Sequence, residues 1–543
     1  MYNCNWSNIR DCGHSIGTHL CGLIFRTLAR HIAYVPLGTP RNVPHQIAEN
    51  ALANLRTPTT STASRKGTDG MSKLNIIENC SNFHFIGIGG IHMSGLAEIL
   101  HREKYGISGS DRDNSENVAR LNAAGIKVKI GHNAQNIPAD CEIVVYNAAI
   151  PWDNEEMLAA KTRGLRLMDR AELVGRLMQN YTHAICVAGT HGKTTTTSML
   201  SVIFMAANTN PTVLNGGILA AMGGALRIGG RDVFIAEACE YHNSFLKFFP
   251  TTGVILNMEM DHSDFFPDFS TLSQSFLNFA KKIPKDGMLV INGESGGLNS
   301  FLKGVNSNIC VFGTSGGLTA QNLSFDQRGC SVFDVVRDGK LLGGISLAVP
   351  GRHNVQNALA ACACALGHGI AFPVISQSLA TFTGAQRRFQ RVGEFMGAEI
   401  VDDYAHHPTE IAATLSAAKK IAHRRLWAVF QPHTNTRTRQ FLSEFAKSLA
   451  AADESIVLDI YSPAGREEND RPIHAKDLVR EVQGLGMDSR YMPNFDAAKE
   501  YLTRHVQPGD IVITMGAGNI GELAHKLVQP PLIAGLTPPS LRA

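Results

Sequence analysis

The sequence lacks the features that mark several specialised classes of protein. No run reaches about 18 uninterrupted apolar residues, so no membrane span is predicted. The 11 cysteines are scattered, with no CxxC pair and no histidine at metal-ligand spacing, which is typical of reduced thiols in a cytoplasmic protein. A formal net charge of +3 is too small to predict nucleic-acid binding. With 44% hydrophobic and 18% charged residues, the composition is that of an ordinary globular protein.

The two ends of the chain differ from the rest. Residues 1–70 carry seven Lys and Arg against three Asp and Glu, and they end in the low-complexity segment "RTPTTSTASRKGTDG". An organelle transit peptide is one interpretation. However, "MSKLNIIENC" from Met71 is typical of a bacterial start, so we favour a disordered leader or an over-extended reading frame. The Pro-rich residues 527–543 predict a loose tail.

A glycine loop near residue 190 predicts a phosphate site. The apolar stretch "YTHAICVAG" predicts a strand and "TTTTSMLSVIFMAA" predicts a helix, so Gly189–Thr194 falls at a strand-to-helix turn. Glycines there let backbone N–H groups approach an anion, Lys193 can reach terminal phosphates, and the Thr194 hydroxyl can ligate Mg²⁺. The glycines enclose two residues where the usual nucleotide loop has four, and the alternative is a turn with a solvated lysine.

An earlier glycine turn predicts a second anion site. The stretch "NFHFIGIGGIHMSGLAEILHREKY" predicts a strand, a turn and an amphipathic helix, so Gly87, Gly89 and Gly90 can hold a diphosphate at the helix N-terminus. Asp111 ends the next predicted strand roughly 20 residues on, where a dinucleotide-type fold sets an acid against a ribose. For the glycine fingerprint alone, a packing turn is the alternative.

Acidic side chains follow two further predicted strands. The stretch "DVFIAEACEYHNSFL" carries Glu237 and Glu240, and "TTGVILNMEMDHSDFF" carries Asn257, Glu259, Asp261 and His262. Open α/β sheets present their ligand-binding groups at strand ends, and Mg²⁺ beside a triphosphate takes few protein ligands. We therefore predict a divalent metal site here, with solvated loop charges as the alternative.

The remaining pattern predicts an α/β protein of about three domains. Strands such as "EIVDDYA", "LWAVFQPH", "SIVLDIY" and "DIVITMGAG" alternate with helical stretches, and polar residues gather at the strand ends, as in a ligand crevice. We place the domains at residues 71–180, 181–380 and 381–526.

The ordered set of motifs resembles the Mur ligase family. The match runs from about residue 81 to 526 through "HFIGIGGIHMSGLAE", "GTHGKTTTT", "EACEY", "NMEMDH", "GRHNVQNALAA", "GAQRRFQ", "DDYAHHPTE", "FQPHTNTRT" and "MGAGNIGE". The resemblance implies a Rossmann-like N-terminal domain that binds UDP, a central P-loop ATPase-like domain, and a C-terminal Rossmann-like domain that brings in the amino acid. It also implies a reaction of peptidoglycan precursor synthesis. L-alanine is joined to the lactyl carboxylate of UDP-N-acetylmuramate while ATP becomes ADP and phosphate.

The resemblance also implies which residues form each site. The sugar-nucleotide residues are Gly87, Gly89, Gly90, Ser94 and Asp111. The ATP residues are Gly189, Thr190, His191, Gly192, Lys193, Thr194, Thr195, Asn354, Asn357, Arg388 and Asp403, with His353 beside the adenine site. The magnesium ligands are Thr194, Glu237 and His262. The catalytic set is Lys193, His406, His407, His433 and Arg437, with Arg439 in the same region.

The implied chemistry explains why these residue types are needed. A carboxylate is a poor acceptor for an amine, so the γ-phosphoryl group of ATP first moves onto it to give an acyl phosphate. Lys193 and Mg²⁺ would neutralise the charge during this transfer. Cations or metal must then hold the oxyanion that forms when the amine attacks. A neutral histidine of the third domain can take the amine proton, and three histidines remain candidates: His406, His407 and His433.

The sequence departs from the family pattern at three places, and the first two bear on substrate selectivity. His92 stands where the commonest family loop has another glycine. Asn435 replaces an aromatic residue often found in "FQPHxYxRT". "EACEY" differs from the form "EADES" but keeps Glu237.

Two other functions stay open. A recycling ligase of the same family would add a preformed peptide to UDP-N-acetylmuramate, and a P-loop ATPase switch would hydrolyse ATP without either acceptor. An NAD-dependent dehydrogenase would leave the second glycine loop without a role. We expect a cytoplasmic enzyme, monomeric or homodimeric, that uses ATP and Mg²⁺ and closes about hinges near residues 180 and 380.

Overall fold

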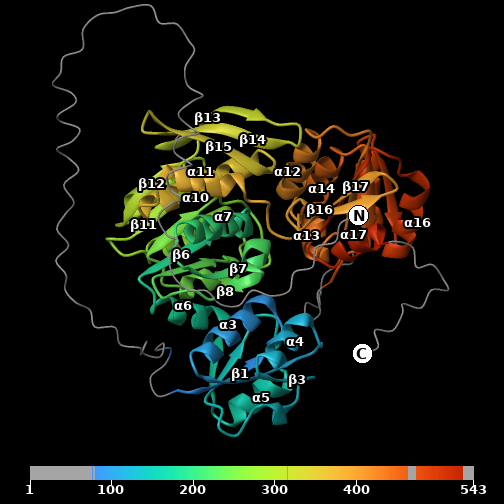
Figure 1. Ribbon diagram of the computed structural model, residues 1–543. Coiled ribbons are helices and arrows are strands. Elements are labelled where there is room, and N and C mark those ends of the chain that lie inside the picture. The colour runs from blue at the N-terminus through green and yellow to red at the C-terminus, as the bar shows by residue number, and fades with distance from the viewer. Residues whose placement is uncertain (1–75, 77–79, 315, 463–472, 530–543) are drawn as a thin grey trace, which may run out of the picture. The chain divides into compact units, whose positions relative to one another are not determined.

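Three β-sheets organise the residues that the computed structural model describes, which are 76, 80–314, 316–462 and 473–529 (Figure 1). The predicted leader, residues 1–70, lies outside these ranges, as does the predicted tail beyond residue 529. Within the described ranges, no helix has the length and apolar character needed to cross a bilayer.

The first sheet has five parallel strands in the order β3-β2-β1-β4-β5. Ser115, Asn154 and Asp169 each accept a backbone N–H in the first turn of the helix that follows, which fixes where α4, α5 and α6 begin. The elements are β1 (Asn82–Ile86), α3 (Ile91–Arg102), β2 (Gly106–Asp111), α4 (Glu116–Ala123), β3 (Lys127–Ile130), η2 (Ala134–Asn136), β4 (Ile143–Tyr146), α5 (Glu155–Thr162), β5 (Arg166–Asp169) and α6 (Arg170–Met178).

The middle sheet has ten strands in the order β15-β14-β13-β12-β11-β10-β6-β9-β7-β8. The strands from β12 to β7 are parallel, whereas β13–β15 and the pair β7–β8 are antiparallel. The strands are β6 (His183–Ala188), β7 (Thr212–Leu219), β8 (Gly224–Arg227), β9 (Val233–Glu237), β10 (Thr252–Ile255), β11 (Met288–Asn292), β12 (Asn308–Phe312), β13 (Leu318–Phe325), β14 (Cys330–Arg337) and β15 (Lys340–Pro350). The helices are α7 (Lys193–Ala206), η3 (Ala220–Met222), η4 (Tyr241–Lys247), α8 (Phe269–Ala280), α9 (Leu298–Gly304), α10 (His353–Gly367) and α11 (Phe372–Ala380).

The third sheet has six strands in the order β16-β17-β21-β18-β19-β20, and only β16 runs antiparallel to its neighbour. The strands are β16 (Gln390–Phe395), β17 (Ala398–Asp403), β18 (Leu426–Phe430), β19 (Glu454–Leu458), β20 (Asp488–Met492) and β21 (Ile511–Met515). The helices are α12 (Pro408–Ala418), α13 (Asn435–Gln440), α14 (Leu442–Leu449), α15 (Ala475–Gly484), α16 (Phe495–His505) and α17 (Gly521–Val528).

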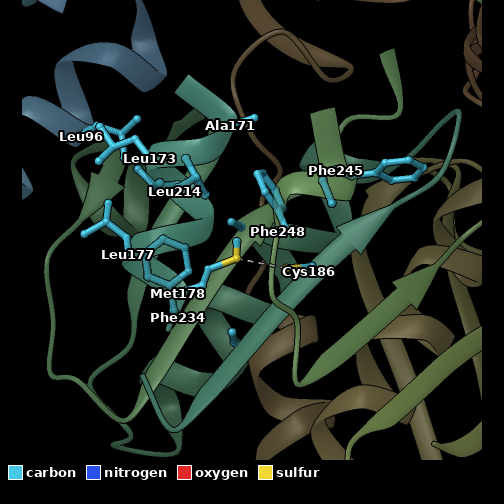
Figure 2. Packing of buried hydrophobic residues seen from close by; sticks show 14 of the residues in the cluster. Leu96, Ala171, Leu173, Leu177, Met178, Cys186, Leu214, Phe234, Phe245 and Phe248 are labelled. Atoms are coloured by element: carbon cyan, nitrogen blue, oxygen red, sulfur yellow. Dashed lines mark hydrogen bonds between the residues drawn. The ribbon is translucent and has the colours of Figure 1, made fainter. Parts of the chain in front are cut away.

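One hydrophobic cluster joins the first sheet to the middle one. Leu96 of α3, Leu173 of α6 and Leu214 of β7 belong to it, together with Phe234 of β9 and Phe245 of η4 (Figure 2). We call this the shared cluster. The third sheet is packed by two clusters of its own.

The prediction of a three-domain α/β fold is confirmed. Apolar runs such as IVVY, LWAVF and IVITM form the parallel strands β4, β18 and β21, as their sequences predicted. The antiparallel strands β13–β15 were not predicted, because helix-free connections join them and give no βαβ signal. The domain limits near residues 180 and 380 stay predictions.

Candidate active site

The loop between β6 and α7 places Lys193 at the start of a helix. Gly192 caps α7 with a φ of 84°, a left-handed conformation that favours glycine, and a Cβ there would lie 2.4 Å from Asn357 Oδ1. Asn257, just after β10, holds the loop with two hydrogen bonds to His191. Its Oδ1 accepts the His191 N–H at 2.8 Å, and its Nδ2 donates to the His191 carbonyl at 3.0 Å. These contacts fix the shape of the loop.

Lys193 is paired with a carboxylate in this loop. Its Nζ lies 3.0 Å from Glu240 Oε2 and 3.1 Å from the carbonyl oxygen of Thr190. Burial alone would lower the pKa of Lys193, but the Glu240 carboxylate outweighs burial and raises it. Lys193 is therefore charged. To bind a phosphate, it must break its ion pair with Glu240 or contact both groups at once.

Two of the three predicted magnesium ligands, Thr194 and Glu237, lie together. The Thr194 hydroxyl hydrogen-bonds the Glu237 carboxylate, which ends β9 and also accepts the Gly216 N–H. Burial raises the pKa of Glu237, and these bonds offset it only in part. Burial also lowers the pKa of His262, which keeps its imidazole neutral and able to bind metal. A cation at this hydroxyl and carboxylate would offset the cost of the buried negative charge, and His262 as a third ligand stays a prediction.

A second cluster also holds groups that could bind metal. One ligand atom from each of His191, Glu259 and His407 lies within 4.8 Å of the others. However, His191 Nε2 lies 3.1 Å from Glu259 Oε2, and its Nδ1 lies 3.1 Å from Oε1 of Glu410. Burial alone would lower the pKa of His191, but the two carboxylates raise it to about 9. A protonated imidazole has no lone pair for a metal, so we interpret this cluster as an ion-pair bridge.

A cavity of about 250 Å³ lies beside the β6–α7 loop. It brings together seven residues of the predicted ATP site: His191, Gly192, Thr195, Asn354, Asn357, Arg388 and Asp403. The other four follow β6 directly, in the loop and the first turn of α7: Gly189, Thr190, Lys193 and Thr194. Arg388 Nη2 donates to Thr194 Oγ1 at 3.3 Å, so a side chain before the third sheet reaches the loop of the middle sheet. This arrangement suits a nucleoside triphosphate, whose phosphates would face the loop.

Two groups of this cavity already bond within the protein. Asp403 accepts the Phe389 N–H at 2.9 Å and the Ala405 N–H at 2.8 Å, and burial raises its pKa to about 6. Asp403 thereby holds the segment that carries Arg388, and its direct contact with a nucleotide stays a prediction. On α10, Asn357 Nδ2 donates to Asn354 Oδ1 at 3.0 Å.

The first glycine turn is held from within by Asp111. The Gly89 N–H donates to Asp111 Oδ2 at 2.7 Å, and a Cβ on Gly89 would lie 2.9 Å from the same oxygen. Gly87 has a φ of 73° and donates to the Ser110 carbonyl at 2.8 Å. Ser94 is fully buried in α3. Gly90 begins α3 without any side-chain cap, so the N-terminus of this helix is available to an anion. The ribose contact predicted for Asp111 stays a prediction.

The three candidate histidines differ in their hydrogen bonds. His406 Nδ1 lies 3.1 Å from Oε2 of Glu410, whereas His407 Nδ1 accepts the Thr409 N–H at 3.3 Å and so caps α12. The ring of His433 lies 6.2 Å from that of His406, centroid to centroid. The structure therefore brings the rings of His406 and His433 together and gives His407 a structural bond.

Arg437 is bound to Asp261 in the structure. Its Nη2 and Nε lie 2.6 Å and 3.2 Å from Asp261 Oδ1, and both side chains are nearly buried. Burial alone would raise the pKa of Asp261, but the Arg437 guanidinium holds it well below its ordinary value. Arg437 can contact a substrate only by sharing this carboxylate, and its catalytic role stays a prediction.

Sequence reasoning missed two residues of this region. Glu410 pairs with His191 and His406, and its place three residues after His407 in "HHPTE" is the spacing of a capping box that could have indicated it. Arg170 begins α6 and reaches the first turn of α3, but its stretch "RAELVGRLMQ" indicated only a helix.

Family models match most of the chain. They describe the Mur ligase family catalytic domain at residues 82–182, the Mur ligase middle domain at 187–365, and the Mur ligase glutamate ligase domain at 387–518. The chain belongs to the Mur ligase family.

Several individual relatives are ligases of the same name. A UDP-N-acetylmuramate–L-alanine ligase of Agathobacter rectalis is 46% identical over 450 residues, covering 82% of this chain and 98% of the relative. Its counterpart in Acetivibrio thermocellus is 44% identical over 455 residues, covering 83% and 96%. The crystal structure of the UDP-N-acetylmuramate-alanine ligase of Thermotoga maritima superposes with a TM-score of 0.70 at 27% identity, covering 82% of this chain and 98% of that one.

Proposed function

We propose that the chain is an ATP-dependent ligase of peptidoglycan precursor synthesis that joins L-alanine to the lactyl carboxylate of UDP-N-acetylmuramate, with ADP and phosphate as products. The observation that carries this proposal is the identity of 44–46% with relatives named for that reaction, over more than four fifths of the chain. The cavity beside the β6–α7 loop supplies the nucleotide site that such a ligase needs.

The residues of this cavity suit a two-step reaction. The substrate carboxylate first attacks the γ-phosphorus of ATP, and ADP leaves an acyl phosphate behind. Lys193 and Arg388 both lie at the loop, where their charges stabilise the transferring phosphoryl group. A magnesium ion held by Thr194, Glu237 and His262 would add to this neutralisation. The amine of L-alanine then attacks the acyl carbon, and phosphate leaves.

Hydrogen bonding favours His406 as the group that takes the amine proton. Its Nδ1 faces two acceptors, the Tyr404 carbonyl at 3.0 Å and Glu410 Oε2 at 3.1 Å, so Nδ1 carries the proton and Nε2 keeps a lone pair. His407 has the opposite tautomer, because its Nδ1 lone pair accepts the Thr409 N–H. Neutral His407 therefore has no free lone pair with which to act as a base.

Variants of these two histidines test the proton transfer. We expect His406→Gln to lower kcat by about 100-fold and to remove the pH dependence that a histidine base imposes. His407→Asn keeps a good helix cap and serves as the matched control. Wild-type turnover and pH profile in variants of His406, His407 and His433 alike would exclude a histidine base.

The direct test of function is ADP release by the purified full chain. The assay contains ATP, Mg²⁺ and UDP-N-acetylmuramate, with L-alanine, L-serine, glycine or a muropeptide tripeptide as acceptor. We expect turnover that requires the sugar nucleotide and is fastest with L-alanine. ADP release that is indifferent to both acceptors would exclude a ligase and indicate an ATPase switch.

A recycling peptide ligase is the second candidate. The crystal structure of a murein peptide ligase of Psychrobacter arcticus superposes with a TM-score of 0.64 at 25% identity, covering 82% of this chain. Turnover with the tripeptide alone, and none with L-alanine, would favour this function.

The location and the oligomeric state of the enzyme are part of the same proposal. We place the enzyme in the cytoplasm, where ATP and sugar nucleotides are available, as a monomer or homodimer. Light scattering on the purified chain distinguishes these states from a larger assembly.

A further inference from the structure

Arg170 forms no ion pair with a carboxylate of another described residue. It occupies the first position of α6, and its Nη1 lies 3.4 Å from His92 Nδ1 on α3. Among the described residues, none of the ion pairs within 4.0 Å includes Arg170. The neighbouring Asp169 is committed elsewhere, since its carboxylate accepts the Glu172 N–H at 3.0 Å and pairs with Lys247.

The position of Arg170 is electrostatically unfavourable. The N-terminus of a helix carries partial positive charge, so a cation at its first residue is destabilising. The guanidinium is also only partly exposed, and burial lowers its pKa. His92 supplies no negative charge to offset it, since burial lowers the pKa of that imidazole to about 3 and keeps the ring neutral. An anion bound here would remove these costs.

Arg170 lies between the first glycine turn and the predicted metal ligands. On one side, His92 belongs to the first turn of α3, directly after Gly90. On the other side, His92 hydrogen-bonds the backbone of Asn215, and the next residue, Gly216, donates its N–H to Glu237. The positive charge of Arg170 also interacts electrostatically with the Glu237 carboxylate. A group bound at Arg170 would therefore lie next to the site of phosphoryl transfer.

A cavity of about 250 Å³ opens onto Arg170. Its lining includes Tyr146 and Trp152, whose ring centroids lie 5.6 Å apart, and the ion pair of Lys247 with Asp169. Aromatic faces beside the Arg170 guanidinium suit a sugar ring that carries an acidic substituent.

We propose that Arg170 binds the carboxylate of the acidic sugar of the sugar-nucleotide substrate, and holds that carboxylate where it accepts the phosphoryl group. The inference rests on the proposed function and extends it, because it assigns acceptor binding to the first α/β unit. The guanidinium can grip both carboxylate oxygens in a bidentate arrangement. The sugar then lies over Tyr146 and Trp152.

Binding measurements without turnover test this assignment. Dissociation constants are measured by calorimetry for UDP-N-acetylmuramate, for UDP-N-acetylglucosamine, which lacks the lactyl carboxylate, and for UDP. We expect Arg170→Gln to weaken UDP-N-acetylmuramate about 30-fold and to leave the other two ligands unchanged. Arg170→Lys should recover part of the loss, because it restores the charge but not the bidentate grip.

Controls separate this inference from the proposed function. Arg504→Gln changes an exposed arginine of α16 and should bind all three ligands as the wild type does. A melting temperature of Arg170→Gln at or above that of the wild type shows that the variant is folded. Equal weakening of all three ligands would overturn the inference and assign Arg170 to the diphosphate, and unchanged binding of UDP-N-acetylmuramate would overturn it as well. If the wild-type chain itself does not bind UDP-N-acetylmuramate, the proposed function fails instead.

Discussion

The two glycine turns of this chain share a local architecture but have opposite internal partners. Each connects a buried strand to a helix whose N-terminus has no side-chain cap, β1 to α3 and β6 to α7. In the first turn the partner is an acid, Asp111, which accepts the backbone N–H of Gly89. In the second turn a base, Lys193, lies on the loop and is itself held by Glu240.

The two partners determine which internal contact each turn must break to bind an anion. The first can receive one at the start of α3 without breaking the Asp111 contact, because Gly90 and the helix N-terminus lie beside it. The second must exchange a strong ion pair for contacts with phosphate. A glycine fingerprint therefore indicates where an anion binds, while its neighbours decide what binding costs.

The largest effect is expected from the lysine of the second turn. Lys193→Ala should lower the rate of ADP release about 10³-fold, because it removes a preorganised positive charge from the transferring phosphoryl group. The matched control is Lys340→Ala, at an exposed position in the hairpin between β14 and β15. Equal rates in the two variants would remove Lys193 from the phosphate site.

The crowding of the first turn can be tested with two neighbouring glycines. Gly89→Ala should lower the free energy of unfolding by about 1–3 kcal/mol, because the added Cβ would lie 2.9 Å from both Asp111 Oδ2 and Val118 Cγ2. Gly90→Ala is the matched control for stability, since its nearest neighbour would be 3.6 Å away. Melting curves of both variants give the comparison, and equal melting temperatures would contradict it.

The ion-pair bridge of the second turn should make stability depend on pH. The pKa of His191 is raised from 6.5 to about 9 in the folded chain, so its protonated form stabilises the fold. This contribution, about 3 kcal/mol, is fully present below pH 6.5 and is lost as the pH rises through about 9. Denaturant midpoints of the wild type should therefore fall more steeply over this range than those of His191→Gln. Parallel profiles would show that the bridge is not formed in solution.

The smallest effect concerns the partner of Lys193. Glu240→Gln should tighten ATP binding about fivefold, because the lysine loses its competing carboxylate before the nucleotide arrives and gains the phosphates afterwards. The dissociation constant of ATP without sugar nucleotide measures this effect. Weaker binding would mean that Glu240 holds Lys193 in the orientation that the phosphates need.

Local sequence patterns were enough to predict most of the fold. The strand, glycine turn and helix around Gly192 were predicted because the apolar period changes from strand to helix at that residue. The hairpins of β13–β15 and the reversed edge strand β16 were not predicted. Strand direction depends on pairing between distant segments, which local periodicity does not contain.

Some residues of the candidate site were predicted from the sequence, and others were not. The ATP residues were predicted as a group, and the structure lines one cavity with seven of them, from Gly192 in the loop to Asp403 at the end of β17. The pair of Arg437 with Asp261 joins residues 176 positions apart, and no spacing rule could indicate it. Arg170 was hidden for another reason, since a helix pattern records which face is apolar but not which polar side chain lacks a partner.

The shared cluster has a consequence for how the molecule unfolds. Because α3 and α6 pack their leucines against β7 and β9, the first two sheets have a common apolar interior, whereas the third has interiors of its own. Heating should therefore melt the first two as one cooperative unit, with the third free to melt in a separate transition. Rotation near residue 380 would have to break polar contacts such as the ion pair of Arg437 with Asp261, whereas rotation near residue 180 would have to expose the leucines of the shared cluster to water.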